Sequence, residues 1–311
     1  MKQTVSLIGV PSDIGASDRG ASMGPEALRV AGIVETLEKQ GFNVKDAGDV
    51  AGPKNPELPS VDGYRHLVEN TIWANNIQAA IYKELNDGNF PIMMGGDHAM
   101  SIGSIAAVTK YCAENDRPVC MIWIDAHADF NTNETSPSGN IHGMPVAVAT
   151  GYGHPDLLAV GHAIPMIQPE NVYQIAIRSV DMNEKNLVIK SGISVYDMRR
   201  IDEIGIRQTM QDILHDIAEK GAHLHVSFDV DSLDPPIAPG VATTIPGGLT
   251  YREAQLCMEM IHDSGLMGSM DIAEINPALD TNNGTAKIAV DLTASLFGRQ
   301  IFPTHSLYQS E

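Results

Sequence analysis

The chain has 311 residues, of which 43% are hydrophobic, so it can bury a sizeable core in one large domain or two ordinary ones. It carries 39 acidic against 20 basic side chains, for a formal net charge of -19. A surface of this sign repels nucleic acids and anionic membranes, so neither is expected as a partner. Three scattered cysteines without a C-x-x-C pair favour a reducing compartment. Because no stretch approaches the ~18 apolar residues of a membrane span, we expect a cytoplasmic protein.

Short apolar runs alternate along the chain with amphipathic stretches. The runs expected to form strands are 5–10, 90–94, 119–124, 172–177, 193–196, 223–228 and 268–272. The stretches expected to form helices are 25–39, 63–86, 102–112, 205–219, 251–264 and 285–296. This alternation predicts an α/β fold with three α-β-α layers around a central, mostly parallel sheet. Residues 1–311 are expected to form a single domain.

Two long irregular segments, 131–145 and 231–248, each follow an apolar run. Ligand sites in open parallel sheets lie beyond the carboxyl ends of the strands. We therefore expect the chemistry of this protein in these two loops.

The first candidate site motif follows the apolar run 119–124 directly and reads Asp-Ala-His-Ala-Asp. In an extended chain, residues two apart point to the same side. Asp125, His127 and Asp129 would then project together, with two small alanines between them.

Two further strand ends repeat this logic. Asp229 and Asp231 follow the run 223–228, and a Gly-Gly-Asp-His segment ending in His98 follows the run 90–94. A lone Asp-x-Asp or Gly-Gly-Asp-His is more typical of a cap or turn. Three such motifs in one α/β chain instead favour a shared site, and so many carboxylates require compensating cations.

The predicted ligand set is rich in carboxylates, with some imidazole and no thiolate. This set suits Mn²⁺-like cations, although zinc, cobalt and iron remain open, and more than four ligands suit two ions. His142, in a Gly-rich loop, could titrate near neutral pH and shuttle protons. The sequence has no Gly-x-Ser-x-Gly elbow, which favours attack by a metal-activated water over a covalent route.

With these motifs in hand, the chain resembles the ureohydrolase family, and within it the arginases. The matching segments are 20–25, 44–49, 95–98, 125–129, 139–145, 227–231, 247–253 and 271–277. The resemblance covers nearly the whole chain. It implies hydrolysis of the guanidinium group of L-arginine to L-ornithine and urea, by a hydroxide that bridges two Mn²⁺ ions per chain.

The resemblance also implies the ligands of each ion. One ion would be held by His98, Asp125, Asp129 and Asp229, and the other by Asp125, His127, Asp229 and Asp231, so that Asp125 and Asp229 bridge. The catalytic residues would be His142, Glu274 and Asp129. Glu274 would orient the guanidinium group, and His142 would act as proton shuttle or as acid for the departing amine.

The amino-acid end of the substrate is matched by a further set of positions. Asn131 and Ser138 match residues that contact the α-carboxylate, and Asp181 matches the acid that faces the α-ammonium, with Glu184 more peripheral. This set favours L-arginine over agmatine, which lacks the carboxylate. One segment departs from the pattern: where arginases often have Gly-Thr-Pro, residues 242–246 read Ala-Thr-Thr-Ile-Pro, in which Thr243 keeps the matching hydroxyl.

Arg252 and Glu253 match a subunit-contact segment, which implies a homotrimer or homohexamer. Three alternatives stay open. An agmatinase or guanidino-acid hydrolase would share the metals but not the amino-acid clamp. A one-zinc amide deacetylase of related fold would not need His98 and Asp129 as ligands. A non-catalytic metal-binding module would release no urea.

Overall fold

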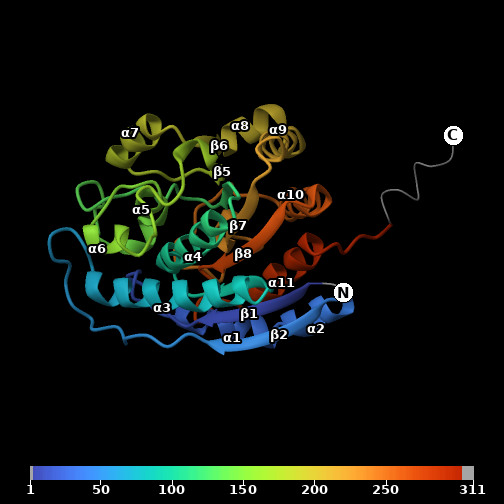
Figure 1. The fold of residues 1–311 in the computed structure, drawn as a ribbon, viewed down its shortest axis with the longest axis horizontal. Helices are drawn as coiled ribbons and strands as arrows, with labels where there is room; N and C mark the ends of the chain where they lie inside the picture. The colour runs from blue at the N-terminus through green and yellow to red at the C-terminus, as the bar shows by residue number, and fades with distance from the viewer. Residues whose placement is uncertain (1–2, 303–311) are drawn as a thin grey trace.

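The computed structural model describes residues 3–302, which contain one sheet of eight strands (Figure 1). The strands are β1 (Thr4–Val10), β2 (Asn43–Asp49), β3 (Phe90–Gly95), β4 (Val119–Ile124), β5 (Val172–Ile177), β6 (Ser194–Asp197), β7 (His223–Asp229) and β8 (Met267–Ala273). Their order is β2-β1-β3-β8-β7-β4-β5-β6, and every neighbouring pair is parallel. All seven predicted strands are present.

Helices cover both faces of the sheet, which confirms the predicted three-layer α/β fold (Figure 1). One face is covered by α1 (Gly24–Val30), α2 (Ile33–Lys39), α8 (Met198–Ile204), α9 (Ile206–Glu219), α10 (Tyr251–Ser264) and α11 (Gly284–Leu296). The other is covered by α3 (Leu67–Asn86), α4 (Ser101–Glu114), α5 (Pro145–Ala149), α6 (Pro155–Leu158) and α7 (Met182–Ser191). Strand β4 is apolar on both sides because both sides are buried: Ile122 packs into the first layer and Trp123 into the second.

The expected single helix over 25–39 is wrong. The structure has two helices, α1 and α2, separated at Ala31 and Gly32. Gly32 has φ 84, in the left-handed region that glycine adopts without a steric penalty. The apolar spacing continues across the break, so periodicity alone did not reveal it.

Strand β2 and helices α5, α6, α7 and α8 were not predicted, and two of these elements, β2 and α7, have polar sequences. Strand β2 lies at an edge of the sheet, pairs only with β1 and is largely exposed, so it lacks an apolar run. Helix α7 begins with a capping box, in which Asp181 is the cap and the Glu184 side chain accepts from its backbone N–H. The expected helix over 63–86 begins later, at Leu67, because His66 has φ 53.

The order of the strands places four predicted motifs beside one another. The chain leaves β3 and enters β4 three positions further along the sheet, and β7 and β8 later fill the two places between them. The carboxyl ends of β3, β8, β7 and β4 are therefore adjacent, and the loops 131–145 and 231–248 begin at this edge. Among residues 3–302, no helix has the length and apolar character needed to cross a membrane.

Candidate metal centre

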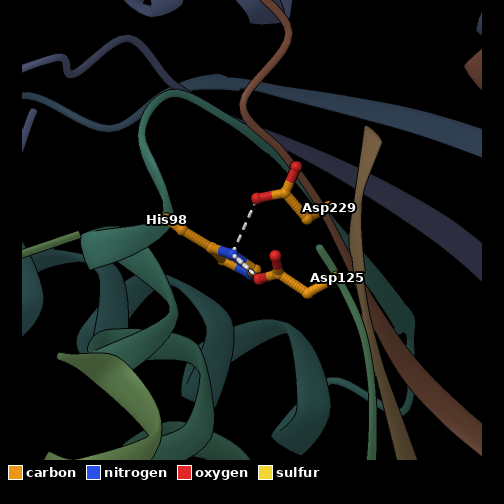
Figure 2. Close-up of side chains that lie close together, drawn as sticks. All are labelled: His98, Asp125 and Asp229. Atoms are coloured by element: carbon orange, nitrogen blue, oxygen red, sulfur yellow. Dashed lines mark ion pairs between the residues drawn. The ribbon is translucent and has the colours of Figure 1, made fainter. Parts of the chain in front are cut away.

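The first cluster of side chains surrounds one ring nitrogen of His98 (Figure 2). His98 Nδ1 lies 3.1 Å from Asp125 Oδ2 and 3.0 Å from Asp229 Oδ2, the two contacts that Figure 2 marks. It also lies 3.3 Å from Asp129 Oδ2. These residues come from the ends of β3, β4 and β7, and all four are buried. His98, Asp125 and Asp229 offer three ligand atoms close enough to hold one metal ion.

The second cluster surrounds His127. Its Nδ1 lies 3.4 Å from Asp125 Oδ1 and 3.1 Å from Asp231 Oδ2. Burial alone would lower the pKa of this imidazole, but the carboxylates of Asp231 and Asp125 raise it to about 12. Asp125 belongs to both clusters, with one oxygen directed to each histidine.

Local hydrogen bonds fix these carboxylates. The backbone N–H of His127 donates to Asp125 Oδ1 at 2.6 Å, and that of Asp231 donates to Asp229 Oδ1 at 2.7 Å. The indole N–H of Trp123 donates to the other Asp125 oxygen at 2.9 Å. Each Asp-x-His or Asp-x-Asp pair therefore forms a local turn at its strand end. The segment 125–129 is not extended as expected, because the chain bends at Ala126 and Asp129 has φ 47.

The turn after β3 needs glycine at Gly96, where a Cβ atom would lie 2.5 Å from the carbonyl oxygen of Ser12. Asp97 is bound within this turn, since its side chain accepts from the backbone N–H of Gly15 at 2.9 Å and of Ala99 at 3.0 Å. This arrangement directs His98, and not Asp97, toward the carboxylates.

The buried charge of this centre suits cations. Burial and the neighbouring carboxylates raise the pKa of Asp129 to about 6 and that of Asp229 well above its usual range. At Asp125 the imidazoles of His127 and His98 outweigh the effect of burial and lower the pKa. His98 Nδ1 is buried and makes no hydrogen bond, although three carboxylates surround it. Oxygen and imidazole donors in this arrangement fit divalent cations.

A cavity of about 250 Å³ adjoins both clusters. The predicted site residues that line it are His98, His127, Asp129, Asn131, Ser138, His142, Asp181, Glu184, Asp229, Asp231, Thr243 and Glu274. Asp125, which is fully buried, lies behind this wall. The fold thus brings together residues that are far apart in the sequence.

The half-buried His142 and the buried Glu274 form a pair beside the His98 cluster. His142 Nδ1 lies 3.0 Å from Glu274 Oε1, which also accepts from the backbone N–H of His98 at 2.8 Å. Burial would lower the pKa of His142, but the Glu274 carboxylate raises it to about 9. Glu274 has φ 63, an unusual value for a non-glycine residue, and its Oε2 is buried without a partner. A cationic group in the cavity could therefore pair with Glu274.

Asn131 and Asp181 meet further along the wall. The Asn131 Nδ2 group donates to Asp181 Oδ2 at 3.0 Å, and Asn131 Oδ1 is buried without a partner. The hydroxyl oxygen of Ser138 accepts from the backbone N–H of Asn140 at 3.2 Å. This part of the cavity offers an anion beside neutral polar groups.

The two other predicted substrate-binding side chains, Glu184 and Thr243, also have protein partners. The Glu184 oxygens accept from the backbone N–H groups of Phe130 at 2.8 Å and Asp181 at 2.9 Å. The Thr243 hydroxyl donates to Asp231 Oδ2 at 2.9 Å. In this geometry, Glu184 holds the cavity wall together and Thr243 supports the second cluster.

Segment 242–246, whose sequence differs from the usual arginase pattern, is linked to the second cluster by Arg178. No role was predicted for Arg178. Its Nη2 group donates to the carbonyl oxygens of Ile245 at 2.7 Å and Asp231 at 2.8 Å. Ser227, which contacts His98, lies in the segment 227–231 that resembles the family, but no role was predicted for it. The signal for it was a polar residue at every second position of the otherwise apolar strand β7, namely His223, His225 and Ser227.

Comparisons with known proteins agree with this geometry. The model of the Arginase family matches residues 3–298. The arginase of Bacillus caldovelox is 42% identical over 299 residues, which cover 96% of this chain and 99% of that protein. Its native structure has a TM-score of 0.92, with coverage of 97% of this chain and 100% of that chain. The structure of Entamoeba histolytica arginase in complex with L-ornithine has a TM-score of 0.88 at 30% identity, covering 96% and 99%.

Proposed function

The chain belongs to the arginase family and is a hydrolase of that family, and we propose that it hydrolyses L-arginine to L-ornithine and urea with two Mn²⁺ ions per chain. Support for the substrate comes from the cavity, which has a buried anion at one part and an anion with neutral polar groups at another. Support for the metals comes from the two clusters that share Asp125.

The proposed ligands of the first ion are His98, Asp125, Asp129 and Asp229, and those of the second are Asp125, His127, Asp229 and Asp231. The buried, unpartnered His98 Nδ1 and the surrounding carboxylate oxygens support this assignment. When bound, two such ions would supply positive charge that lowers the pKa of water and makes hydroxide available near neutral pH.

Glu274 is proposed to bind and orient the guanidinium group. Its buried Oε2 has no partner within the described chain and can accept a charge-assisted hydrogen bond from a planar N–H donor. Holding the guanidinium carbon in one place removes much of the entropic cost of bringing the reactants together. His142 can hold a proton while its Nδ1 is paired with Glu274, and it is proposed to deliver one to the departing amine.

The amino-acid end of the substrate is proposed to lie at Asp181, Asn131 and Ser138. Asp181 supplies an anion for the α-ammonium, and the neutral groups of Asn131 and Ser138 can face the α-carboxylate. L-Ornithine is bound in the structure of the Entamoeba histolytica relative, which supports an amino-acid ligand for this chain as well.

The observation that carries the proposal is the unpartnered Glu274 Oε2 beside two clusters of side chains that could hold a metal ion. Its test is the rate of urea release from L-arginine and from agmatine by the Mn²⁺-loaded protein. We expect kcat/KM to be at least about 10²-fold higher for L-arginine, because agmatine leaves the carboxylate-facing groups unpaired. A preference for agmatine would contradict the assignment of substrate.

We also propose that the chain assembles as a homotrimer or homohexamer. The family match at Arg252 and Glu253 supports this, although within one chain these residues have local partners at the start of α10. Glu253 accepts from the backbone N–H of Thr250 at 2.8 Å, and Arg252 donates to Gln255 at 2.5 Å. Light scattering tests the proposal, and a monomer would refute it.

A further inference from the structure

A row of buried polar side chains runs away from the candidate metal centre, between the sheet and α4. It begins at His98, whose Nε2 lies 2.9 Å from the hydroxyl oxygen of Ser227 on β7. Ser227 Oγ lies 3.5 Å from Ser101 Oγ on α4, and the Ser101 hydroxyl donates to Asp271 Oδ2 on β8 at 3.0 Å. All four residues are at most 1% exposed, and of them only His98 lines the cavity.

Asp271 fixes the direction of every hydrogen bond in this row. An ionised carboxylate only accepts, so the single hydrogen of the Ser101 hydroxyl is committed to Asp271. At the 3.5 Å contact Ser101 Oγ can then only accept, so a hydrogen bond there uses the hydrogen of Ser227. Ser227 Oγ is left as an acceptor, and the partner that can donate to it is His98 Nε2.

The consequence falls on the tautomer of His98. If Nε2 carries the hydrogen, Nδ1 carries the lone pair, and Nδ1 is the atom that faces Asp125, Asp129 and Asp229 without a hydrogen bond. The flat contact with Trp123, whose ring centroid lies 4.0 Å away at an angle of 11°, holds the imidazole plane in place. The lone pair is therefore directed before any cation arrives.

We propose that Asp271, acting through Ser101 and Ser227, is a positioning residue that keeps His98 in the tautomer able to bind the first metal ion. This inference rests on the proposed function, since it assumes that His98 is a metal ligand. Outer partners of metal-ligating histidines fix the tautomer of the ring, and losing one costs about 10- to 100-fold in metal affinity.

Asp271 also directs a second branch, which does not lead to the metal centre. His225 Nε2 lies 3.1 Å from Asp271 Oδ2, and its Nδ1 lies 2.9 Å from Ser269 Oγ. His223 Nε2 lies 2.9 Å from the same Ser269 oxygen, at the far end of β7. By the same reasoning, His225 donates to Asp271, Ser269 donates to His225, and His223 donates to Ser269.

Helix α4 provides a matched pair of variants. Ser101 and Ser104 both donate to Asp271 Oδ2, at 3.0 and 2.5 Å, and both are fully buried. Of the two, Ser101 is the one whose hydroxyl oxygen contacts that of Ser227. Each serine-to-alanine change removes one donor from the same carboxylate, but Ser101→Ala also breaks the path to His98.

The test is a titration of chelator-treated protein with Mn²⁺, in which free Mn²⁺ is measured by electron paramagnetic resonance. We expect the unchanged protein and Ser104→Ala to bind two ions per chain with the same affinities. Ser101→Ala should lower the affinity for one of the two ions by about 10- to 100-fold and leave the affinity for the other unchanged. Equal Mn²⁺ binding by the two variants, or equal loss, would overturn the inference.

A second variant guards against misfolding of Ser101→Ala. Asp271→Asn keeps the shape of the side chain but weakens the hydrogen-bond acceptor. It should therefore lower the affinity for the same ion. Ser269→Ala, on the second branch, should leave both affinities unchanged while lowering the free energy of unfolding of the metal-free protein. If the unchanged protein binds fewer than two ions, the proposed function fails; if it binds two and Asp271→Asn matches Ser269→Ala, only the inference fails.

Discussion

His142 Nδ1 and Glu274 Oε1 lie 3.0 Å apart in a wall where both side chains are largely shielded from water. The two residues come from a loop after β4 and from the end of β8, so the pairing depends on the order of the central strands. Their contact links a group that can hold a proton to a group that can face a cationic substrate.

This pairing predicts the pKa of His142. In the metal-free protein, Glu274 raises it to about 9, so Glu274→Gln should lower it toward its usual value because the neutral amide no longer stabilises imidazolium. The measurement is an NMR titration of the His142 ring, assigned by its loss in His142→Asn. Glu184→Gln is the control, because Glu184 lines the same cavity but bonds to backbone groups. An unchanged His142 pKa in Glu274→Gln would contradict the pairing.

A second prediction concerns the amino-acid end of the substrate. Asn131→Asp places a negative charge where the α-carboxylate of L-arginine is proposed to lie, and it should lower kcat/KM for L-arginine by about 10- to 100-fold, the equivalent of one lost hydrogen bond to a charged group. Agmatine lacks the carboxylate and should be affected less.

The check is the ratio of the two kcat/KM values in Asn131→Asp and in the unchanged enzyme. Thr135→Val is a suitable control, since Thr135 lies in the same loop but outside the cavity wall. If Asn131→Asp lowers kcat/KM for both substrates to the same extent, Asn131 does not contact the carboxylate.

A third prediction concerns stability at low pH. Burial, with the charges of Arg117 and His225, lowers the pKa of His223 in the folded protein to about 3, against an ordinary value of 6.5 in the unfolded chain. Below pH 6.5 the unfolded chain therefore takes up the proton first. The contribution of His223 to the free energy of unfolding should therefore fall by about 1.4 kcal/mol for each pH unit between about 6.5 and 3.

The comparison is denaturant unfolding of metal-free protein at pH 7 and pH 5. His223→Gln should lose less stability over this interval than the unchanged protein, because the titrating group is gone. His215→Gln, at an exposed position, should behave like the unchanged protein. An equal loss of unfolding free energy from pH 7 to pH 5 in all three proteins would show that His223 does not contribute to this pH dependence.

Gly32 gives a fourth prediction, on the fold itself. Its φ of 84 separates α1 from α2, and a Cβ atom there would meet only the Glu35 carboxylate at 3.5 Å. Gly32→Ala should thus lower the free energy of unfolding by about 1 kcal/mol through backbone strain alone. Gly284→Ala is the control, because Gly284 has no positive φ and ample space, and it should be neutral or slightly stabilising. Equal unfolding midpoints for the two variants would contradict this account.

The sequence predicted best what is local. Each metal motif is a short segment directly after an apolar strand, and a parallel sheet places such strand ends at one edge. Asp125 and His127 could therefore be assigned to one site without coordinates. Edge strand β2 and helix α7 lack apolar periodicity, so the pattern that found the buried elements could not find them.

What the sequence did not reveal depends on contacts between distant segments. The pairing of Ser227 with His98 joins residues 129 positions apart, and that of Ser101 with Asp271 joins residues 170 positions apart. The alternation of polar residues in β7 marks one face as unusual, but it does not identify α4 as the helix that covers it. The backbone conformations of Asp129 and Glu274 could not be predicted from the sequence either, because their positive φ values arise from the packed site.

The most direct test of the proposed chemistry joins metal binding to turnover in one experiment. Chelator-treated protein is titrated with Mn²⁺, and bound metal and urea release from L-arginine are measured after each addition. We predict no urea from the metal-free protein and a rate that reaches its maximum as the second ion per chain is bound. Full activity with one ion, or no urea with two ions bound, would contradict the account.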